Sequence, residues 1–444
     1  YLALLCLLPL QSQARDKFLN IQEITTPSGI SVWLVEDHTL PIINLQFSFR
    51  DSGTALDPAE KQGLVRMLSN TMDEGAGDMD AQTFQKMLAD HAIDLHFSAS
   101  RDGFGGELQM LSRHQEVGFN LLRAAINEPR FDDEAIARMR DANMARIKSS
   151  MTDPEWMAAR LLNDRAFEGH PYARNSGGTL SSLPTITADD LRAFRAHLTR
   201  DRLLVTIAGD ITADAVKTHV DAIFSALPAT TDIAAPEDMT VKNGGTLTLY
   251  EQDMPQTIIQ IMMPAFGRKD SDYYALLVAN YIFGGAGFGS RLMEVAREQR
   301  GLTYGIYSSV DTYRHTNVLT ISTSAKNASA GEILDIIQAE MEKMVTQPVP
   351  DQELADAKSY LTGSLPLSLT STGKISGIMM SLRTEDLPVT YLDQYTAHIN
   401  EVTPADIQRV AARLLKPESM TTIMVGKPEH IAATKKVDVL PNVN

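Results

Sequence analysis

Arg297 and Tyr304 are the two residues of this sequence whose types and spacing point most directly to chemistry. They stand seven positions apart, on either side of Gly301. The pattern predicts that Arg297 ends a helix, that Gly301 turns the chain and that Tyr304 opens the next strand. Their tips could then converge on one peptide carbonyl, where a guanidinium and a phenol would hold the backbone and stabilise an oxyanion. Taken singly, each has a structural interpretation, as a cation at a helix C-terminus and as a half-buried strand residue.

A glycine-rich loop precedes this pair. Such a loop cradles a phosphate when it follows a strand and is closed by Lys and then Ser or Thr. Here the loop follows a helical run from Tyr273 to Phe283, and no such closing pair is present. We therefore expect a flexible turn that lines a substrate-binding cleft. The glycines assigned to substrate binding are Gly284, Gly285, Gly287 and Gly289.

Other catalytic patterns are weak in this sequence. Of its ten histidines, His91 and His96 are five positions apart, which places them on different faces of a helix or of a strand. Histidines in such positions are more often surface or core residues than metal ligands. A Gly-x-Ser-x-Gly elbow does not occur, and Phe288-Gly-Ser-Arg does not form one. A hydrolase with its own serine nucleophile is therefore a poor interpretation.

An internal repeat organises the elements that must position these residues. The segments Thr187 to Gly209 and Thr403 to Gly426 have the same character. In each, a Thr caps a helix that has acidic residues in its first turn, and a β-branched strand follows and ends at Gly. The two copies are offset by 216 residues at the Thr and by 217 at the Gly. Two copies of one domain are therefore predicted.

A second pair of matching segments lies upstream in each copy. Strands predicted at 95–100 and 106–111 correspond to strands predicted at 304–309 and 318–323. A helix with apolar residues at helical spacing follows each pair, at 116–127 and at 330–345. Hairpin-connected strands combined with long helices predict an α+β fold, in which helices cover one face of a mostly antiparallel sheet.

These repeats also give the expected domain boundaries. The first domain should span residues 20–226 and the second residues 246–434. Residues 227–245 are rich in Pro, Ala, Thr and Asp and close with Asn-Gly-Gly, which is typical of a linker. Tandem copies of one domain often enclose a cleft between them.

The first ten residues form the longest apolar run of the sequence. This run is too short to span a bilayer and is similar to the hydrophobic region of a secretory signal, with a small-x-small cleavage site at Ser12 and Ala14. We expect residues 1–14 to be a signal peptide and the protein to be periplasmic; a buried N-terminal helix is the alternative. The single cysteine, Cys6, lies in this run, so the mature chain would be stabilised by its core and not by disulfides.

The charge balance argues against nucleic acid and membrane as partners. Lys and Arg number 40 against 56 for Asp and Glu, which gives a net charge of −16 without any basic cluster. Nucleic acid and anionic membrane both require a concentrated positive surface. A hydrophobic fraction of 43% fits a globular protein with a large core.

The segment around Arg297 resembles a signature of the M16 (pitrilysin and insulinase) metallopeptidase family. The shared features are a Gly-Ser-Arg-Leu helix start at 289–292, an Arg-Glu pair at 297–298 and Gly-Leu-x-Tyr at 301–304. The spacing of Arg297 and Tyr304 is that of the pair of Arg and Tyr found in this family. The resemblance extends over nearly the whole chain that follows the predicted signal.

In the first half, a helical segment resembles the zinc motif of the same family but has lost its ligands. Gly63-Leu-Val-Arg-Met-Leu-Ser-Asn stands where the family has Gly-Leu-Ala-His-x-x-Glu-His, in which two His bind zinc and the Glu acts as general base. A Glu on a later helix, before an Asp-Pro, is the third ligand. The matching positions here are Arg66, Ser69, Asn70 and Arg146. Two cations at these positions would repel a divalent ion, so no metal is expected in this chain.

The resemblance implies that this chain works together with another one. Some bacterial members of the family divide the work between a subunit that has the zinc motif and a subunit that keeps only the Arg and Tyr pair. This chain is similar to the second kind, which forms half of a clamshell. The implied function is the zinc-free subunit of a periplasmic heterodimeric peptidase, whose HxxEH-containing partner holds the zinc and whose substrates are peptides or unfolded polypeptides. Arg297 and Tyr304 are then catalytic residues in trans. The alternative is a stand-alone pseudopeptidase that binds peptides or scaffolds an assembly.

Overall fold

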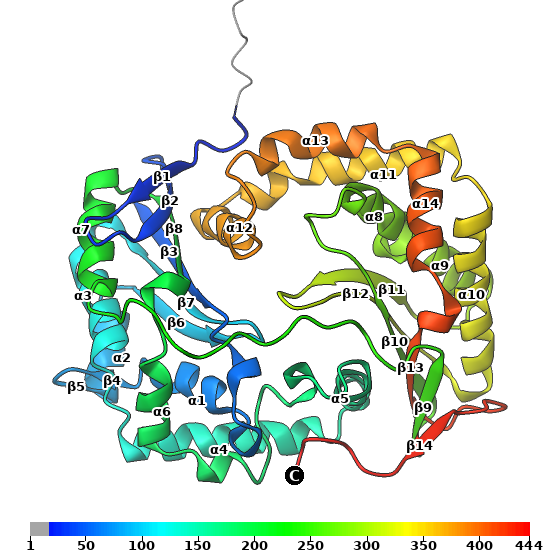
Figure 1. The fold of residues 1–444 in the computed structure, drawn as a ribbon, viewed down its shortest axis with the longest axis horizontal. Helices are drawn as coiled ribbons and strands as arrows, with labels where there is room; N and C mark the ends of the chain where they lie inside the picture. The colour runs from blue at the N-terminus through cyan, green and yellow to red at the C-terminus, as the bar shows by residue number, and fades with distance from the viewer. Residues whose placement is uncertain (1–16) are drawn as a thin grey trace, which may run out of the picture.

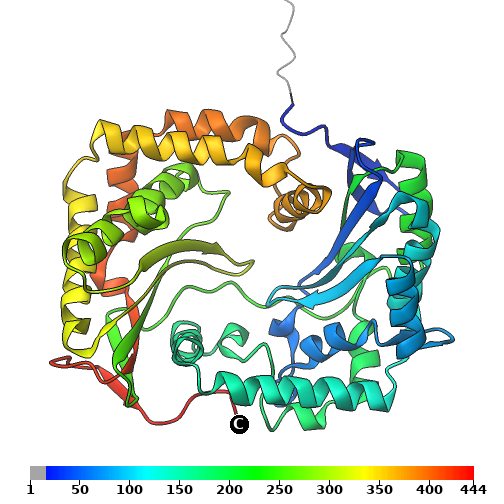
Figure 2. The same ribbon diagram turned by 180° about the vertical axis from the view of Figure 1, so that it is seen from behind.

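The structure, a computed structural model, describes residues 17–444 (Figure 1). The predicted signal peptide, with Cys6, lies outside the described residues. Across residues 17–444, none of the helices combines the length and the apolar character that crossing a membrane requires. Two halves of mixed helix and sheet face each other in the plane of the view, as both Figure 1 and Figure 2 show.

Each half contains one six-stranded sheet. The order of the first sheet is β1-β2-β8-β3-β7-β6, and that of the second is β14-β9-β13-β10-β12-β11. The strands of the first sheet are β1 (Gln22–Thr25), β2 (Ser31–Glu36), β3 (Ile42–Arg50), β6 (Asp94–Ala99), β7 (Gly103–Leu111) and β8 (Leu203–Gly209). The strands of the second sheet are β9 (Thr246–Glu251), β10 (Gln256–Pro264), β11 (Ile306–Thr312), β12 (Asn317–Lys326), β13 (Thr421–Gly426) and β14 (Lys435–Val437). A short hairpin, β4 (Gly75–Ala76) and β5 (Met79–Asp80), stands apart from both.

The two sheets share the same topology over five strands, which confirms the predicted repeat. In each, the strand that follows the capped helix runs parallel to one neighbour (β8 to β2, β13 to β9) and antiparallel to the other (β3 and β10). The outermost strands differ, since β1 pairs antiparallel with β2 whereas β14 pairs parallel with β9. The sheets are therefore mostly antiparallel, as predicted.

The two helices predicted at 116–127 and 330–345 are α3 and α10, and their observed ends agree with the prediction to within one residue. The helices of the first half are α1 (Leu64–Thr71), α2 (Ala81–Asp90), α3 (Gln115–Asn127), α4 (Asp133–Ser150), α5 (Pro154–Ala166), α6 (Ala188–Arg195) and α7 (Ala213–Phe224). Those of the second half are α8 (Tyr273–Asn280), α9 (Arg291–Met293), α10 (Ala330–Thr346), α11 (Asp351–Ser364), α12 (Thr372–Thr384), α13 (Tyr391–Glu401) and α14 (Pro404–Leu414). Residues 227–245, the expected linker, contain no helix or strand.

The repeated helix and strand are specified by the same local chemistry in both halves. Thr187 and Thr403 each form a capping box at the start of α6 and α14, with Asp190 and Asp406 as the reciprocal partners. The strand that follows ends at a glycine with positive φ, 130° at Gly209. A Cβ on Gly209 would stand 2.0 Å from the Ile42 carbonyl oxygen, so only glycine fits there.

Each sheet is covered on a second face by one helix from the other half. Helix α5 buries Met157 and Leu161 in a cluster with Ile258 of β10 and Ile423 of β13. Helix α12 likewise packs against the first sheet. Its buried residues Met379 and Leu382 share a cluster with Trp33 and Ala208. The sequence predicted helices on one face only, because periodicity shows which face of a helix is apolar but not which sheet receives it. The two halves are therefore interlocked.

Candidate functional site

Helices α1 and α4 bring together residues that the family resemblance matches to a metal site. The Asn143 amide of α4 donates to the Asn70 amide oxygen of α1 at 3.0 Å, and Arg146 donates to the Asn143 amide oxygen at 3.0 Å. Ser69 is turned away from this chain of bonds, because its hydroxyl donates to the Arg66 carbonyl at 2.9 Å. The structure thus assembles Asn70 and Arg146 through Asn143, a residue that sequence reasoning did not single out.

Arg66 completes this group from the preceding turn of α1. Its Nη2 donates to the Ala99 carbonyl oxygen at 2.8 Å, at the end of β6. Burial lowers the pKa of Arg66, and the charge of nearby Arg146 lowers it further. The Nε of Arg66 is buried and has no hydrogen-bond partner among residues 17–444. Arg66 lies one helical turn before Asn70, and Asn70 is joined to Arg146 through Asn143, so the two cations belong to neighbouring turns of α1 and α4.

This donor set does not fit a zinc ion. Zinc in proteins takes thiolate, imidazole or carboxylate ligands, and a guanidinium has no lone pair to offer. In the described part of the chain, no group of three or more His, Cys, Asp or Glu residues is placed to hold a metal. Two adjacent positive charges also raise the electrostatic cost of a divalent cation.

Asp57 is a residue near this site that sequence reasoning missed. Its carboxylate accepts the N–H groups of Gly63 at 2.8 Å and Val65 at 3.0 Å, and so anchors the start of α1. Gly63 itself has φ of 89°, which favours glycine. Burial raises the pKa of Asp57 to about 7, although the two N–H bonds oppose that rise. The only signal in the sequence was an acidic residue six positions before a glycine.

The predicted catalytic pair lies at the surface of the second half. Arg297 belongs to a π-helical turn (Glu294–Gln299) that continues α9, and Tyr304 precedes β11 by two residues, so the predicted strand begins later than expected. The guanidinium carbon of Arg297 lies 4.5 Å from the ring centroid of Phe288. Tyr304 is 84% exposed. Within residues 17–444, the structure records no hydrogen bond between Arg297 and Tyr304.

The glycines of the loop have different environments. Gly284 is buried in a π-helical turn (Tyr281–Gly285), and a Cβ there would lie 2.5 Å from the Ser308 hydroxyl oxygen of β11. That close approach alone explains the glycine. Gly285 and Gly289 are exposed, and Gly287 has φ of 58° with no atom within 4 Å of an added Cβ. Their assignment to substrate binding stays a prediction.

Exposed aromatic side chains surround the pair, which the sequence did not reveal. Phe288 is 68% exposed and Tyr307, on β11, is 51% exposed. Strand β11 is an outermost strand of its sheet. Large exposed aromatic groups beside a free strand edge are suited to contact an extended peptide or a partner protein.

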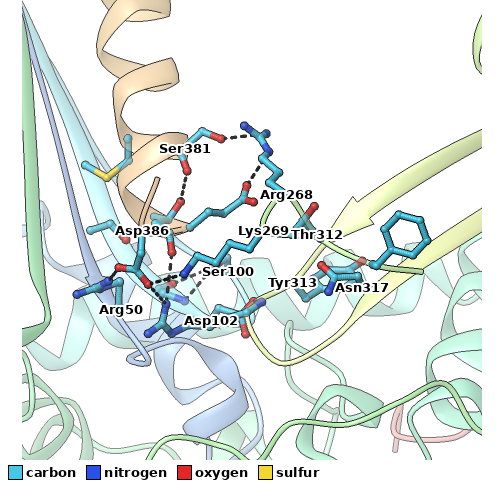
Figure 3. A pocket seen from close by; sticks show the side chains of 18 of the residues that line it. Arg50, Ser100, Asp102, Arg268, Lys269, Thr312, Tyr313, Asn317, Ser381 and Asp386 are labelled. Carbon is cyan, nitrogen blue, oxygen red and sulfur yellow. Dashed lines mark hydrogen bonds and ion pairs between the residues drawn. The ribbon is translucent and has the colours of Figure 1, made fainter. Parts of the chain in front are cut away.

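A cavity of about 710 Å³ lies between the two halves (Figure 3). Its lining combines Arg50 and Asp102 of the first half with Lys269 and Tyr313 of the second, and Asp386, just after α12, closes it. Asp386 forms ion pairs with Arg50 and, at 3.5 Å, with Lys269. The sequence analysis expected a cleft between the two domains but could not name its lining, because these residues come from several segments that only the interlocked fold brings together.

Comparisons with known proteins agree with this geometry. The family described as "Peptidase M16 inactive domain" matches residues 185–361. A relative named "Non-peptidase homolog YmxG", from Helicobacter pylori, is 28% identical over 79% of this chain and 80% of its own. One named "Uncharacterized zinc protease YmxG", from Bacillus subtilis, is 22% identical over 79% of this chain and 85% of its own.

A solved structure is similar over the whole fold. It is described as a peptidase M16 inactive domain from Pseudomonas fluorescens, with a TM-score of 0.86 and 26% identity, and it matches 94% of this chain and 100% of that one. The two six-stranded sheets and this structural likeness agree with the fold that the sequence predicted. The chain therefore resembles the M16 peptidases in sequence and in fold, and its residues 185–361 match the family described as "Peptidase M16 inactive domain".

Proposed function

We propose that this chain is the zinc-free subunit of a periplasmic heterodimeric M16-like peptidase that degrades peptides or unfolded polypeptides. The observation that carries the proposal is the state of the former metal position. The helices that would present zinc ligands are packed as a unit, yet they present Arg66, Asn70 and Arg146 in place of ligands. A chain built in this way needs a hydrolytic ion from an HxxEH-containing partner.

Arg297 and Tyr304 are the residues that would act on the substrate. The exposed phenol of Tyr304 can donate its O–H, and the guanidinium of Arg297 can donate in a planar fork, to the oxygen of a scissile carbonyl. Such donors stabilise the negative charge that develops on that oxygen. Zinc in the partner would supply the activated water, and this chain would supply substrate positioning.

Reconstitution with the HxxEH-containing partner tests the proposal. Peptidase activity of the mixture should require both chains and zinc. Because one lost oxyanion donor costs roughly 100-fold to 1000-fold in kcat, Arg297→Ala and Tyr304→Phe should each lower kcat by about that factor, with little change in the affinity of the two chains. Arg300→Ala is the matched control, since Arg300 forms an ion pair with Glu332 at 2.9 Å, and it should leave activity unchanged.

The second candidate function is a stand-alone pseudopeptidase that binds peptides or scaffolds an assembly. The name of the Helicobacter pylori relative, "Non-peptidase homolog", favours it. If the reconstituted mixture cleaves peptides equally well with Arg297→Ala and Tyr304→Phe, or if no zinc-dependent cleavage arises at all, this second function replaces the first.

A further inference from the structure

We propose that Arg66 and Arg146, at the former metal position, form a binding site for a carboxylate group of an extended peptide. The inference rests on the proposed peptide-handling function and gives it a specificity. The proposed ligand is a carboxylate, which would bind to Arg66 and Arg146, the two cations at these positions. The argument has three parts: the charge of the site, the way its side chains are held, and the strand beside it.

The site carries positive charge that the chain does not neutralise locally. Neither guanidinium forms an ion pair with a carboxylate among the described residues. The acid whose charge acts on Arg66 is Asp57, and its oxygens are already occupied by the N–H groups of Gly63 and Val65. Asp57 is also buried with its pKa raised to about 7, so it is a weak counter-charge near neutral pH. An external anion would complete the site.

Each guanidinium group already has one hydrogen-bond partner in the chain, although Arg146 is exposed and Arg66 is half-buried. Arg146 is fixed by the amide oxygen of Asn143, a residue only 5% exposed, and Asn143 is itself fixed by Asn70. Arg66 is fixed by the Ala99 carbonyl, and its buried Nε has no partner among residues 17–444. Pre-organised donors lose little freedom on binding, and two planar forks match the two oxygens of a carboxylate.

Strand β6, at which Arg66 ends, offers an open edge to a peptide. It pairs with β7 alone and is an outermost strand of its sheet. The Ser100 N–H bonds to the Gly103 carbonyl at 2.8 Å, and Ala99 faces Phe104 in the adjacent pair. In an antiparallel pair of strands, hydrogen-bonded and non-hydrogen-bonded residue pairs alternate. Because Ser100 and Gly103 are hydrogen-bonded, Ala99 and Phe104 are not, and the Ala99 carbonyl points away from β7, toward the open edge.

The same alternation leaves the main-chain groups of Leu95 and Phe97 on that edge free for a further strand. A peptide that pairs with them would run toward the position where Arg66 closes the edge by bonding to Ala99. Its carboxylate would then meet the two guanidinium groups. Free inorganic anions have no such strand to pair with, so the edge favours a peptide as the carrier of the charge.

Binding of matched peptides to the isolated chain tests the inference. One pair of extended peptides has both ends blocked and differs only by Glu against Gln. A second pair is uncharged apart from a free or an amidated C-terminus. Because hydrogen bonds to charged groups strengthen binding by roughly 10-fold to 100-fold, at least one carboxylate peptide should bind at least about tenfold more tightly than its neutral analogue. The pair that shows the difference identifies a side chain or the C-terminus as the source.

Arg66→Gln combined with Arg146→Gln should abolish this preference and leave the affinity for the neutral peptides unchanged. The control combines Arg123→Gln with Lys148→Gln, which removes the same charge from exposed positions on α3 and α4 and should keep the preference. A second variant, Arg66→Lys with Arg146→Lys, keeps the charge but loses the planar forks, and should retain only part of the preference. Thermal unfolding of each variant shows that it is folded.

Equal affinity of the wild-type chain for the acidic and neutral peptides would overturn the inference, as would equal loss of preference in the control variant. Tight binding of inorganic phosphate without discrimination among the peptides would also overturn it. These measurements use neither zinc nor the partner. The peptide-binding result and the reconstitution result are therefore independent. The peptides can bind without preference even if the reconstituted mixture is active, and the preference can be measured even if the mixture is inactive.

Discussion

At the scale of single residues, the positions that the family resemblance matches to zinc ligands hold Arg66, Asn70 and Arg146, which are joined to their surroundings by hydrogen bonds. Arg66, Asn70 and Arg146 could be located from the sequence, because the spacing on α1 and the Asp-Pro after α4 match a known motif. The hydrogen bonds of these residues could not be predicted from the sequence. Asn143 links two of them and Ala99 holds the third, and both contacts join segments far apart in the chain. Asp57 was missed for the same reason, since its role depends on the turn before α1.

Asp57 gives a prediction about pH. Its pKa is raised to about 7 in the folded chain, above the usual value of a carboxyl group in an unfolded chain, so the folded state binds its proton more tightly. Its contribution to stability is therefore greatest below pH 4 and is lost as pH rises to about 7. The Asp57→Asn variant has no ionisable group at this position. As pH rises from about 4 to about 7, the free energy of unfolding of the wild type should therefore fall relative to that of the variant. Denaturant unfolding at a series of pH values measures it; a constant difference would contradict the assignment.

At the scale of elements, α1 and α4 are in direct contact at the positions that the family resemblance matches to a metal site. The bond between Asn143 and Asn70 joins the two helices directly. Periodicity predicted both helices, and motif spacing predicted which turns would meet. The exact ends were less predictable: β11 begins at Ile306 and not at Tyr304, because Gly301 to Gly305 forms an irregular turn after the π-helical segment. The π-helical turns themselves have no signature in sequence periodicity.

The retained packing predicts that zinc binding can be restored. The combined substitutions Arg66→His, Ser69→Glu, Asn70→His and Arg146→Glu place two imidazoles and two carboxylates on α1 and α4. We expect one zinc ion per chain, measured by competition with a chromophoric chelator. The variant that keeps Arg146 should bind zinc at least about tenfold more weakly, because it lacks one ligand and retains a cation. A folded fourfold variant without zinc would show that the helices are not positioned for a metal.

At the scale of the whole molecule, the interlocking of the halves is the feature that the sequence could not predict. The repeat predicted two similar sheets, but the sequence analysis did not predict the crossing helices α5 and α12. Which sheet each helix covers depends on the path of the chain in space. Arg383 of α12 donates to the Val205 carbonyl at 2.6 Å and to the Ser31 carbonyl at 2.9 Å, so polar bonds as well as apolar packing cross between the halves.

This arrangement predicts cooperative unfolding of the two halves. Met379 of α12 is fully buried in the cluster with Trp33. Met379→Ala should therefore lower the free energy of unfolding by about 2–5 kcal/mol, and calorimetry should show one transition for both proteins. Hydrogen exchange should report the loss in β3 and β8 as well as in the second half. Ser359→Ala, at an exposed position on the neighbouring helix α11, is the control and should change stability by less than about 0.5 kcal/mol. Two separate transitions would show that the halves fold independently.

Because α5 and α12 each pack on the sheet of the other half, cutting the chain between the halves has a predictable effect. A chain cut between residues 227 and 245 would yield two pieces. Each piece would expose one apolar face of its sheet, and each would carry one helix whose packing surface lies on the other piece. Neither piece would be expected to persist alone, yet the two should recognise one another on coexpression. Each half is thus expected to need the other in order to cover the apolar surface of its sheet.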